Sequence, residues 1–360
     1  MRWPVSISKR RLGAAAVSLW LVVAPNFGWA GSALETLDAE VTGLYERSKG
    51  AVVKIHAAGD RLLPRTPFGP SHRVSSGFLI DPAGRIVTAD TLVENAASIW
   101  VDWQGRPIPA KLVGRDPLTN LALLQIEAGE PTPFLPLGNS DELRIGSLVV
   151  AIGYPYELPS APVVGFIAGL DISCGRRVFP VNQIRAGCRL SPGQGGGPLL
   201  NARGEVVGLV VAAHGEDQCY GLPVNALKKL CADIVQTGAP QYPWVGLDVS
   251  EHPNTNQING APTWQVSIRE IFSNTPAVTA GFQTHDILLR IATNEIHRSA
   301  DVLNTMFYRR GGDSIQIAIL RDGNTQEVQL VVGHRPEEPP PMIPVRVLPT
   351  PQILPVSAAR

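Results

Sequence analysis

The glycine cluster at residues 191–201 is the part of this sequence best suited to chemistry. It reads SPGQGGGPLLN, and Gly204 and Gly208 follow soon after. Glycine permits the positive φ angles that other residues resist, so such a run lets several backbone N–H groups converge on one point. Converging N–H groups are how an enzyme binds a developing oxyanion. An ordinary glycine turn between two strands is the alternative, and the cluster alone does not choose between them.

Four cysteines form a second set of chemically interesting residues: Cys174, Cys188, Cys219 and Cys231. In an exported chain they would meet an oxidising compartment, where disulfides form. Four cysteines allow three pairings, and the sequence alone does not choose among them. Buried free thiols are the alternative. A metal site is disfavoured because no C-x-x-C spacing or nearby histidine pair is present, and we expect no metal or other cofactor.

The elements that must position these residues have the texture of an all-β domain over residues 50–238. Short runs rich in β-branched residues alternate with turn signals, which is typical of a barrel or sandwich. The predicted strands are residues 51–55, 77–80, 86–88, 99–101, 121–126, 148–152 and 206–212. Residues 60–73 contain three prolines and predict a long loop. Helical spacing over residues 224–236, followed by the Gly-Ala-Pro at 238–240, predicts a helix that ends this domain.

A second unit is predicted at residues 242–333, as a compact α+β domain with five to six strands and two helices. Its strand-like runs are residues 246–249, 264–268, 287–291, 315–320 and 328–332, and its helical pieces lie near residues 276–280 and 300–309. A further helix is predicted within residues 31–49, because Leu34, Leu37 and Leu44 fall on one helical face.

The two ends of the chain differ from its body. Residues 1–30 predict a secretory signal, with basic residues first, an apolar run at 12–24 and small residues at a cleavage site. That run is shorter than the roughly 20 residues of a membrane helix, which disfavours an uncleaved anchor. Residues 334–360 are rich in proline, which prevents helix and sheet ladders, so they predict a disordered tail. A docking site for a partner is the alternative for this tail.

The composition narrows the class of protein. The chain has 31 basic and 31 acidic residues, so its formal net charge is zero. A nucleic-acid-binding protein would need a basic face, so this balance argues against one. Hydrophobic residues make up 44% of the chain, which is enough for a packed core and excludes bulk disorder. With the signal segment, the sequence predicts an exported protein, periplasmic or extracellular.

The surroundings of the glycine cluster resemble the HtrA (DegP-like) family of trypsin-like serine proteases with PDZ domains. Residues 76–80 and 84–88 read SGFLI and GRIVT, similar to the family's Ser-Gly-Phe-Ile-Ile and Gly-x-Ile-Leu-Thr. Residues 116–124 read DPLTNLALL, where the family has Asp-x-x-Thr-Asp-Leu-Ala-Leu-Leu. The likeness covers roughly residues 50–332. It implies a mainly β fold, namely a trypsin-like double β-barrel followed by a PDZ domain.

The three positions that match the family's catalytic triad hold other residues here. The family's Asn-Pro-Gly-Asn-Ser-Gly-Gly-Pro-Leu motif aligns with residues 191–199 and puts Gly195 in the place of the serine. Thr91 aligns with the histidine and Asn120 with the aspartate. Because a triad needs a nucleophile, a base and an orienting carboxylate, the resemblance implies a degenerate triad. Gly193 and Gly195 are expected to keep the N–H groups of an oxyanion hole.

Three nearby residues are weighed as substitute nucleophiles or bases. Ser191 precedes Gly195 by four positions, and His214 follows a predicted strand near the expected peptide groove. Cys188 offers a thiol. We interpret them instead as a loop serine, a surface-loop histidine and a structural thiol. The family's segments that match Cys188 and Cys219 both line the specificity pocket, so the resemblance makes these two residues the candidates for a disulfide.

The second unit resembles a PDZ domain. Its counterpart of the family's carboxylate-binding loop is formed by Trp244, Val245, Gly246 and Leu247. Such a loop presents backbone N–H groups to a peptide carboxylate, while the next strand pairs with the peptide. Leu303 and Phe307 lie one turn apart on the later predicted helix and are expected to line the peptide pocket. Plain core packing is the alternative for each of them.

Together these observations predict a non-catalytic member of the family, exported, that binds extended or C-terminal peptides without cutting them. Envelope protein quality control and scaffolding are the expected roles. The alternatives are an active serine endopeptidase with an unrecognised nucleophile, and a purely structural protein. The expected partners are peptides or unfolded protein segments, with no nucleic acid and no stable membrane span after signal removal. Because family members often trimerise through N-terminal elements, a homo-oligomer is expected as well.

Overall fold

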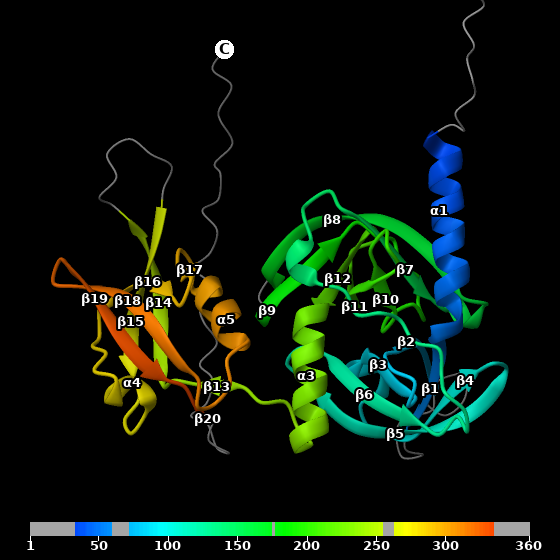
Figure 1. Cartoon of the computed structure of the whole chain (residues 1–360), viewed down its shortest axis with the longest axis horizontal. Helices are drawn as coiled ribbons and strands as arrows, with labels where there is room; N and C mark the ends of the chain where they lie inside the picture. Colours follow the sequence, from blue (N-terminus) through cyan, green and yellow to red (C-terminus); the bar gives the residue numbers. More distant parts are fainter. Residues whose placement is uncertain (1–32, 60–71, 175–176, 255–262, 335–360) are drawn as a thin grey trace, which may run out of the picture. The chain divides into compact units, whose positions relative to one another are not determined.

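The structure is a computed structural model that describes residues 33–59, 72–174, 177–254 and 263–334 (Figure 1). The predicted signal segment lies outside these residues. So does the predicted tail, apart from His334. Helix α1 (Ala33–Ser48) opens the described chain and is followed by the short 3-10 helix η1 (Lys49–Ala51). This agrees with the helix predicted within residues 31–49.

Six strands close the first barrel, in the order β1-β2-β3-β6-β5-β4. They are β1 (Val52–Gly59), β2 (His72–Leu79), β3 (Arg85–Ala89), β4 (Ala96–Trp103), β5 (Arg106–Asp116) and β6 (Leu121–Ile126). Alternating side chains fill its interior, where Ile55, Phe78 and Leu123 are fully buried. The four-residue helix α2 (Asp90–Val93) follows β3 directly and carries Thr91 out of the barrel wall.

A second barrel has the order β10-β11-β12-β9-β8-β7. Its strands are β7 (Leu148–Gly153), β8 (Ala161–Cys174), β9 (Arg177–Ala186), β10 (Pro198–Leu200), β11 (Val206–His214) and β12 (Gln218–Pro223). The 3-10 helices η2 (Ser140–Glu142) and η3 (Pro155–Glu157) lie before β7 and after it. Helix α3 (Val224–Thr237) follows β12 and ends where Gly238 adopts φ +82°, a left-handed C-terminal cap.

The last domain is built on one antiparallel sheet in the order β14-β15-β16-β18-β19, with β17 paired to β16. These strands are β14 (Leu247–Asn254), β15 (Thr263–Ile271), β16 (Ile287–Ile291), β17 (Asn294–Glu295), β18 (Ser314–Arg321) and β19 (Asn324–Val331). Helices α4 (Pro276–Thr279) and α5 (Ser299–Phe307) accompany the sheet. Two short strands, β13 (Pro243–Trp244) and β20 (Gly333–His334), pair with each other. His334, predicted as the start of the tail, is therefore part of a strand.

The mainly β prediction, with two barrels followed by a mixed domain, is confirmed. The prediction of a loop over all of residues 60–73 is wrong at its end, because Arg73 already pairs with Ala57 in β2. Strands β5, β8, β9, β10 and β12 of the barrels had not been predicted, nor had the two-residue strands β13, β17 and β20. Most of the side chains of β5 are at least partly exposed, and β10 is only three residues long, so neither has a clear apolar period.

Candidate functional site

Three glycines of the loop before β10 occupy positions where no other residue fits. Gly193 and Gly196 have φ angles of +97° and +81°. At each of the three, an added Cβ would lie 2.2 or 2.3 Å from a backbone oxygen: that of Tyr154 for Gly193, of Ser76 for Gly196 and of Ile152 for Gly197. Real Cβ atoms do not approach so closely, so the course of this loop depends on glycine.

Gly195, the residue in the serine's place, is different. Its φ is not positive, and an added Cβ would meet only Leu92 Cδ1, at 3.6 Å, which is ordinary van der Waals contact. The backbone at Gly195 therefore accepts a larger side chain. Glycine is not required there by the fold, in contrast to its neighbours.

Ser76 holds the glycine loop in place. Its buried hydroxyl donates to the Gly193 carbonyl at 2.7 Å and accepts from the Tyr154 N–H at 2.9 Å. The Ser76 N–H donates to the Gly195 carbonyl at 3.0 Å. Both carbonyls are thus bound within the protein, while the N–H groups of Gly193 and Gly195 have no acceptor among the described residues. These are the donors expected of an oxyanion hole. Ser76 lies in a matched motif, but its anchoring role was not predicted.

Asn120 connects the remaining triad positions. Its Oδ1 accepts from the Thr91 N–H at 2.8 Å, and its Nδ2 donates to the Val211 carbonyl at 2.7 Å. Leu92, the neighbour of Thr91, is the residue that faces Gly195. The structure therefore brings the three predicted positions to one place. Both ends of the Asn120 amide are used, and a carboxylate here could not donate to the carbonyl of Val211.

The charged groups around Thr91 are paired with one another. Arg115 contacts Asp90 at 2.6 Å and Glu94 at 2.9 Å. Burial is the main cause that raises the pKa of the Asp90 carboxyl, and the Arg115 guanidinium opposes this rise. Arg73 donates to the backbone carbonyls of Thr91, at 2.8 Å, and of Glu94. The carboxylates of Asp90 and Glu94 thus both face a cation, and Arg73 adds a further positive charge beside Thr91.

A hollow of about 130 Å³ lies beside Asn120. It is lined by Thr119, Asn120, Phe179, Val211, Ala212, Ala213, His214 and Tyr220. Residues 212–214 pair with β12 on one side, whereas β10 pairs with β11 only up to Leu209. A bulge at Val211 separates the two parts of β11. The edge of residues 211–214 opposite β12 has no strand partner among the described residues, so an extended peptide can pair with it.

The structure does not assemble a substitute catalytic pair from the residues weighed above. Within the described ranges, no hydrogen bond joins Ser191 to a histidine, and its N–H donates to Gln194 Oε1 at 2.8 Å. The exposed His214 packs its ring edge-on against Tyr220, with 5.7 Å between centroids. Cys188 is fully buried.

Cys188 and Cys219 lie in contact as buried thiols. Ala186 pairs with Cys219 across β9 and β12, and Cys188, two positions after Ala186, reaches the same neighbour. The Cys219 thiol hydrogen-bonds to Cys188 and lowers its pKa, while that bond and burial raise the pKa of Cys219. Cys231 is a separate free thiol, and burial raises its pKa to about 12. The side chain of Cys174 lies outside the described part.

The carbonyls of the predicted carboxylate-binding loop are bound within the protein, as in the glycine loop. The carbonyls of Val245 and Gly246 accept from the N–H groups of Ala277 and Phe272, both at 2.9 Å. Gly246 has φ +75°, and an added Cβ would lie 2.2 Å from the Thr275 side chain. The strand that follows, β14, is an edge strand of its sheet. A peptide can therefore pair with that edge.

The two residues of α5 predicted to line the peptide pocket differ in environment. Leu303 is 37% exposed, whereas Phe307 is 2% exposed. The Phe307 ring packs on Tyr242 and Tyr308, with centroid distances of 5.9 and 5.2 Å. The pocket-lining prediction is wrong for Phe307, because these rings bury it in the core, and Leu303 stays a candidate.

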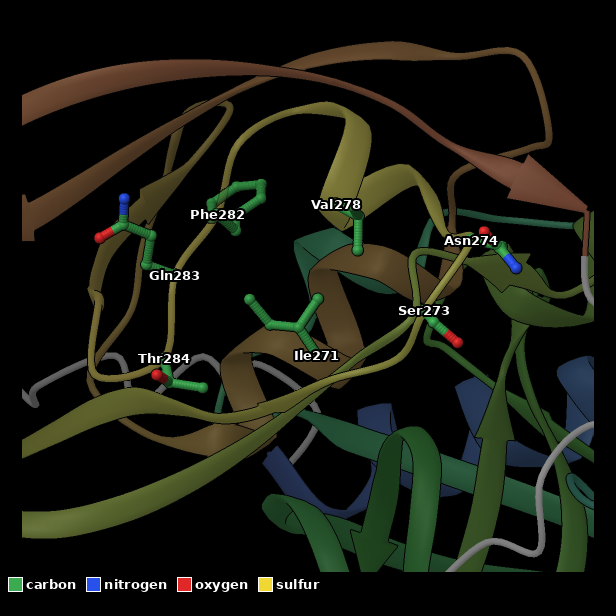
Figure 2. A pocket seen from close by; sticks show the side chains of 7 residues that line it. All are labelled: Ile271, Ser273, Asn274, Val278, Phe282, Gln283 and Thr284. Carbon is green, nitrogen blue, oxygen red and sulfur yellow. The ribbon is translucent and has the colours of Figure 1, made fainter.

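A broader hollow, of about 700 Å³, lies at another place in this domain (Figure 2). It is lined by Ile271, Ser273, Asn274, Val278, Phe282, Gln283 and Thr284. Figure 2 shows Ile271 and Val278 turned toward each other across it. No residue of the predicted carboxylate-binding loop lines it.

In the described ranges, every helix is too short or too polar to span a membrane. No group of three or more His, Cys, Asp or Glu side chains in these ranges is arranged to hold a metal ion.

Comparisons with known proteins agree with this architecture. Residues 75–209 match the family of trypsin-like peptidase domains, and residues 243–332 match the family of PDZ domains. Solved structures of the HtrA-type protease AlgW, with a tripeptide and with a decapeptide, superpose with TM-scores of 0.68 and 0.65. They are 24% and 22% identical, each covers 83% of this chain, and 98% and 99% of the AlgW chains are covered.

Two curated relatives extend the likeness in sequence. The serine protease Do-like HtrA of Bacillus subtilis is 31% identical over 274 residues, which are 70% of this chain and 61% of the relative. A probable periplasmic serine endoprotease, DegP-like, of Pseudomonas fluorescens is 30% identical over 292 residues, 76% of this chain and 60% of the relative. The chain thus spans about three fifths of the length of these relatives. With a trypsin-like double barrel, a PDZ domain and these relatives, the chain belongs to the HtrA family.

Proposed function

We propose that this protein is an exported, non-catalytic HtrA-type protein that binds extended or C-terminal peptides. One observation carries the proposal. Gly195 stands where the family has its serine, although the backbone there would accept a side chain, since only Leu92 Cδ1 lies within 4 Å of an added Cβ. The nucleophilic side chain is therefore missing from a backbone that could still carry it.

The other two triad positions support the same reading. Thr91 cannot take a proton near neutral pH, and Asn120 carries no charge to stabilise an imidazolium. In a serine protease that has the same triad on an unrelated fold, removing the triad costs about a million-fold in kcat, and the residual rate comes from the oxyanion hole and binding. Hydrolysis at such a rate is too slow to serve as a biological turnover.

The means of binding peptides are retained in both domains. The first domain offers the edge of residues 211–214, the hollow beside it and the N–H groups of Gly193 and Gly195. The second offers the edge of β14 and its preceding loop. AlgW has been solved with a tripeptide and a decapeptide, and DegP-like relatives are named periplasmic, which supports peptide ligands and export for this chain. Envelope quality control and scaffolding are the roles we propose.

An active endopeptidase is the second candidate, because the relatives are named proteases. One hydroxyl–imidazole hydrogen bond is present in the last domain, where Ser250 Oγ lies 2.9 Å from His252 Nε2. Within the described ranges, no ion pair joins His252 to a carboxylate, and both side chains lie on the exposed edge strand β14. This pair lacks the orienting third group and the oxyanion donors of a protease site.

Fluorophosphonate labelling with a parallel casein digest separates the two candidates. We expect no labelling and no digestion by the wild type. The positive control is the triple variant Thr91→His, Asn120→Asp, Gly195→Ser, and the single variant Gly195→Ser is matched to it. The triple variant should regain labelling at residue 195, and the single variant should not, because it lacks a base. Labelling of a wild-type serine would overturn the proposal.

A trimer is a further proposal that follows from the family resemblance. Light scattering of the mature protein would measure its mass against 38.6 kDa for the full chain. A mass near three chains supports a trimer, and a mass near one chain contradicts it.

A further inference from the structure

We propose that the former catalytic centre binds the C-terminal carboxylate of a peptide, held by the N–H groups of Gly193 and Gly195. This inference rests on the proposed function, because a working protease would cleave a peptide at this place. It makes the ligand of the cleft a free C-terminus rather than an internal segment.

The two donors are fixed before any ligand arrives. The Gly193 N–H shares its peptide plane with the Pro192 carbonyl, which accepts from the Tyr156 N–H at 2.8 Å. The Gly195 N–H shares its plane with the Gln194 carbonyl, which accepts from the Gly197 N–H at 3.3 Å. Neither plane can therefore turn without losing a hydrogen bond. The forced glycines at 193 and 196 hold the loop on both sides. Neither N–H has an acceptor among the described residues. Adjacent backbone N–H groups of this kind bind anions, and hydrogen bonds to a charged acceptor are about twice as strong as neutral ones.

The missing side chain at Gly195 leaves room for the anion. In a serine protease the hydroxyl projects from this position toward the group that reacts. Here the space around the absent Cβ is bounded by Leu92 Cδ1 at 3.6 Å. A carboxylate can place one oxygen on the two N–H groups and turn the other into this space, which a serine side chain would otherwise occupy.

The electrostatics of the cleft also favour an anion. The family's aspartate is replaced by Asn120, so one negative charge is absent. Asp90 and Glu94 are both paired with Arg115, which leaves neither carboxylate unopposed. Arg73, beside Thr91, takes part in no ion pair among the described residues and adds a positive charge. The Asp-to-Asn replacement therefore removes the group that would repel a carboxylate most directly.

The rest of the ligand is defined by the neighbouring strand edge. From a carboxylate at Gly195, the peptide can follow residues 211–214, whose edge opposite β12 has no strand partner in the described part. The hollow of about 130 Å³ beside that edge is lined largely by apolar groups, including Phe179 and Tyr220. A cavity of about 150 Å³ holds a molecule of benzene, so this one suits a single aliphatic or small aromatic side chain.

The test uses the mature full chain and three fluorescein-labelled octapeptides of one sequence rich in leucine and valine. One has a free C-terminus, one a C-terminal amide, and one is extended by two residues beyond that terminus. Glycine-selective ¹⁵N labelling reports the N–H signals of Gly193, Gly195 and Gly246 separately, which distinguishes the cleft from the second domain. We expect the free acid to shift Gly193 and Gly195 downfield and to bind the cleft about 10- to 100-fold more tightly than the amide.

Variants at one position separate charge from size. Gly195→Asp supplies a carboxylate of its own and should abolish the shift of Gly193 by the free acid. Gly195→Asn has nearly the size of Gly195→Asp without its charge and keeps both N–H groups, so it should weaken the free acid far less. An equal loss in both variants would contradict the inference, because size alone would then explain it.

The remaining outcomes each decide one claim. If acid, amide and extended peptide shift the cleft glycines equally, the carboxylate inference is overturned while peptide binding by the cleft stands. If only Gly246 responds, the carboxylate binds in the second domain and the inference is again overturned. If no peptide moves any of the three signals, the proposed function itself fails.

Discussion

The glycine loop of the second barrel and the loop Trp244–Leu247 of the last domain are held in place in the same way. In each, carbonyls are bound inside the protein and a glycine with positive φ lies where an added Cβ would come within 2.3 Å of another atom. Each loop therefore has a fixed course, and its backbone N–H groups are the donors that we assign to peptide binding. The difference lies in what surrounds them, because hydrolysis at the first loop also needs three side chains.

Under the proposed function, that difference explains how the first site lost its chemistry and kept its shape. Side-chain chemistry depends on single positions, and Thr91, Asn120 and Gly195 are each one substitution away from a working group. Backbone recognition depends on the whole loop, which is held by Ser76 in the first domain and by Thr275 in the second.

The largest effect is expected from adding one methyl group to a forced glycine. Gly196→Ala and Gly246→Ala should each destabilise their domain by about 2–5 kcal/mol, through left-handed strain and overpacking. Gly195→Ala is the matched control and should change the free energy of unfolding by less than about 1 kcal/mol. Urea unfolding measures all three. An equal loss for Gly195→Ala would show that glycine is also required there, and would remove the main support for a purely chemical loss.

A second prediction concerns Cys188 and Cys219, the contacting buried thiols of the first domain, since residues 242–333 contain no cysteine. We propose that Cys188 and Cys219 form a disulfide in the exported protein, giving two protons and two electrons to a disulfide oxidant that becomes two thiols. This should stabilise the first domain by about 2–4 kcal/mol. Peptide mapping after alkylation without reductant identifies the bond, and Cys231→Ser is the control. Recovery of Cys188 and Cys219 as alkylated thiols from oxidised preparations would contradict it.

Much of the fold could be predicted from the sequence because many strands show a local pattern of apolar residues. The strand at residues 121–126 is buried almost throughout and was predicted with its observed bounds. In β5, by contrast, prolines and mostly exposed side chains leave no period to detect, although its partners β4 and β6 hold it in the barrel. Such a strand is specified by tertiary pairing, which a single sequence does not display.

The candidate site, too, was predicted only in part. Thr91, Asn120 and Gly195 were found because flanking motifs fix their alignment. The role of Ser76 and the open space at Gly195 were not found, because both depend on how distant segments such as Tyr154 and Leu92 approach the loop. The prediction that Phe307 lines the peptide pocket was wrong for a related reason, since helical spacing with Leu303 does not say which residues will bury the ring.

A third prediction asks whether Asn120 has become a structural residue. Asn120→Asp removes the donor to the Val211 carbonyl and leaves a buried oxygen facing it, at a cost of about 1–3 kcal/mol. Adding Thr91→His should recover part of this loss, because an imidazole donor can satisfy the new carboxylate. A double-mutant cycle measured by urea unfolding gives the coupling. Strict additivity would mean that the two positions no longer act as a pair.

The smallest effect is a pH dependence that comes from Asp90, beside Thr91. Burial raises its pKa above the ordinary value of 3.8, so the folded state keeps a proton that the unfolded state has already released. The stability contributed by Asp90 is therefore highest below pH 3.8, falls as the pH rises through the raised pKa, and stays low above it. Asp90→Asn removes this titration.

The stability of Asp90→Asn relative to wild type should accordingly rise between pH 3.5 and pH 7, in urea unfolding at fixed salt (about 0.1 M). The opposite slope would mean that attraction to Arg115 outweighs burial, so that Asp90 gains stability when charged. In that case Arg115 would be held by a charged Asp90, and Arg73 would be the cation left beside Thr91 for a peptide carboxylate.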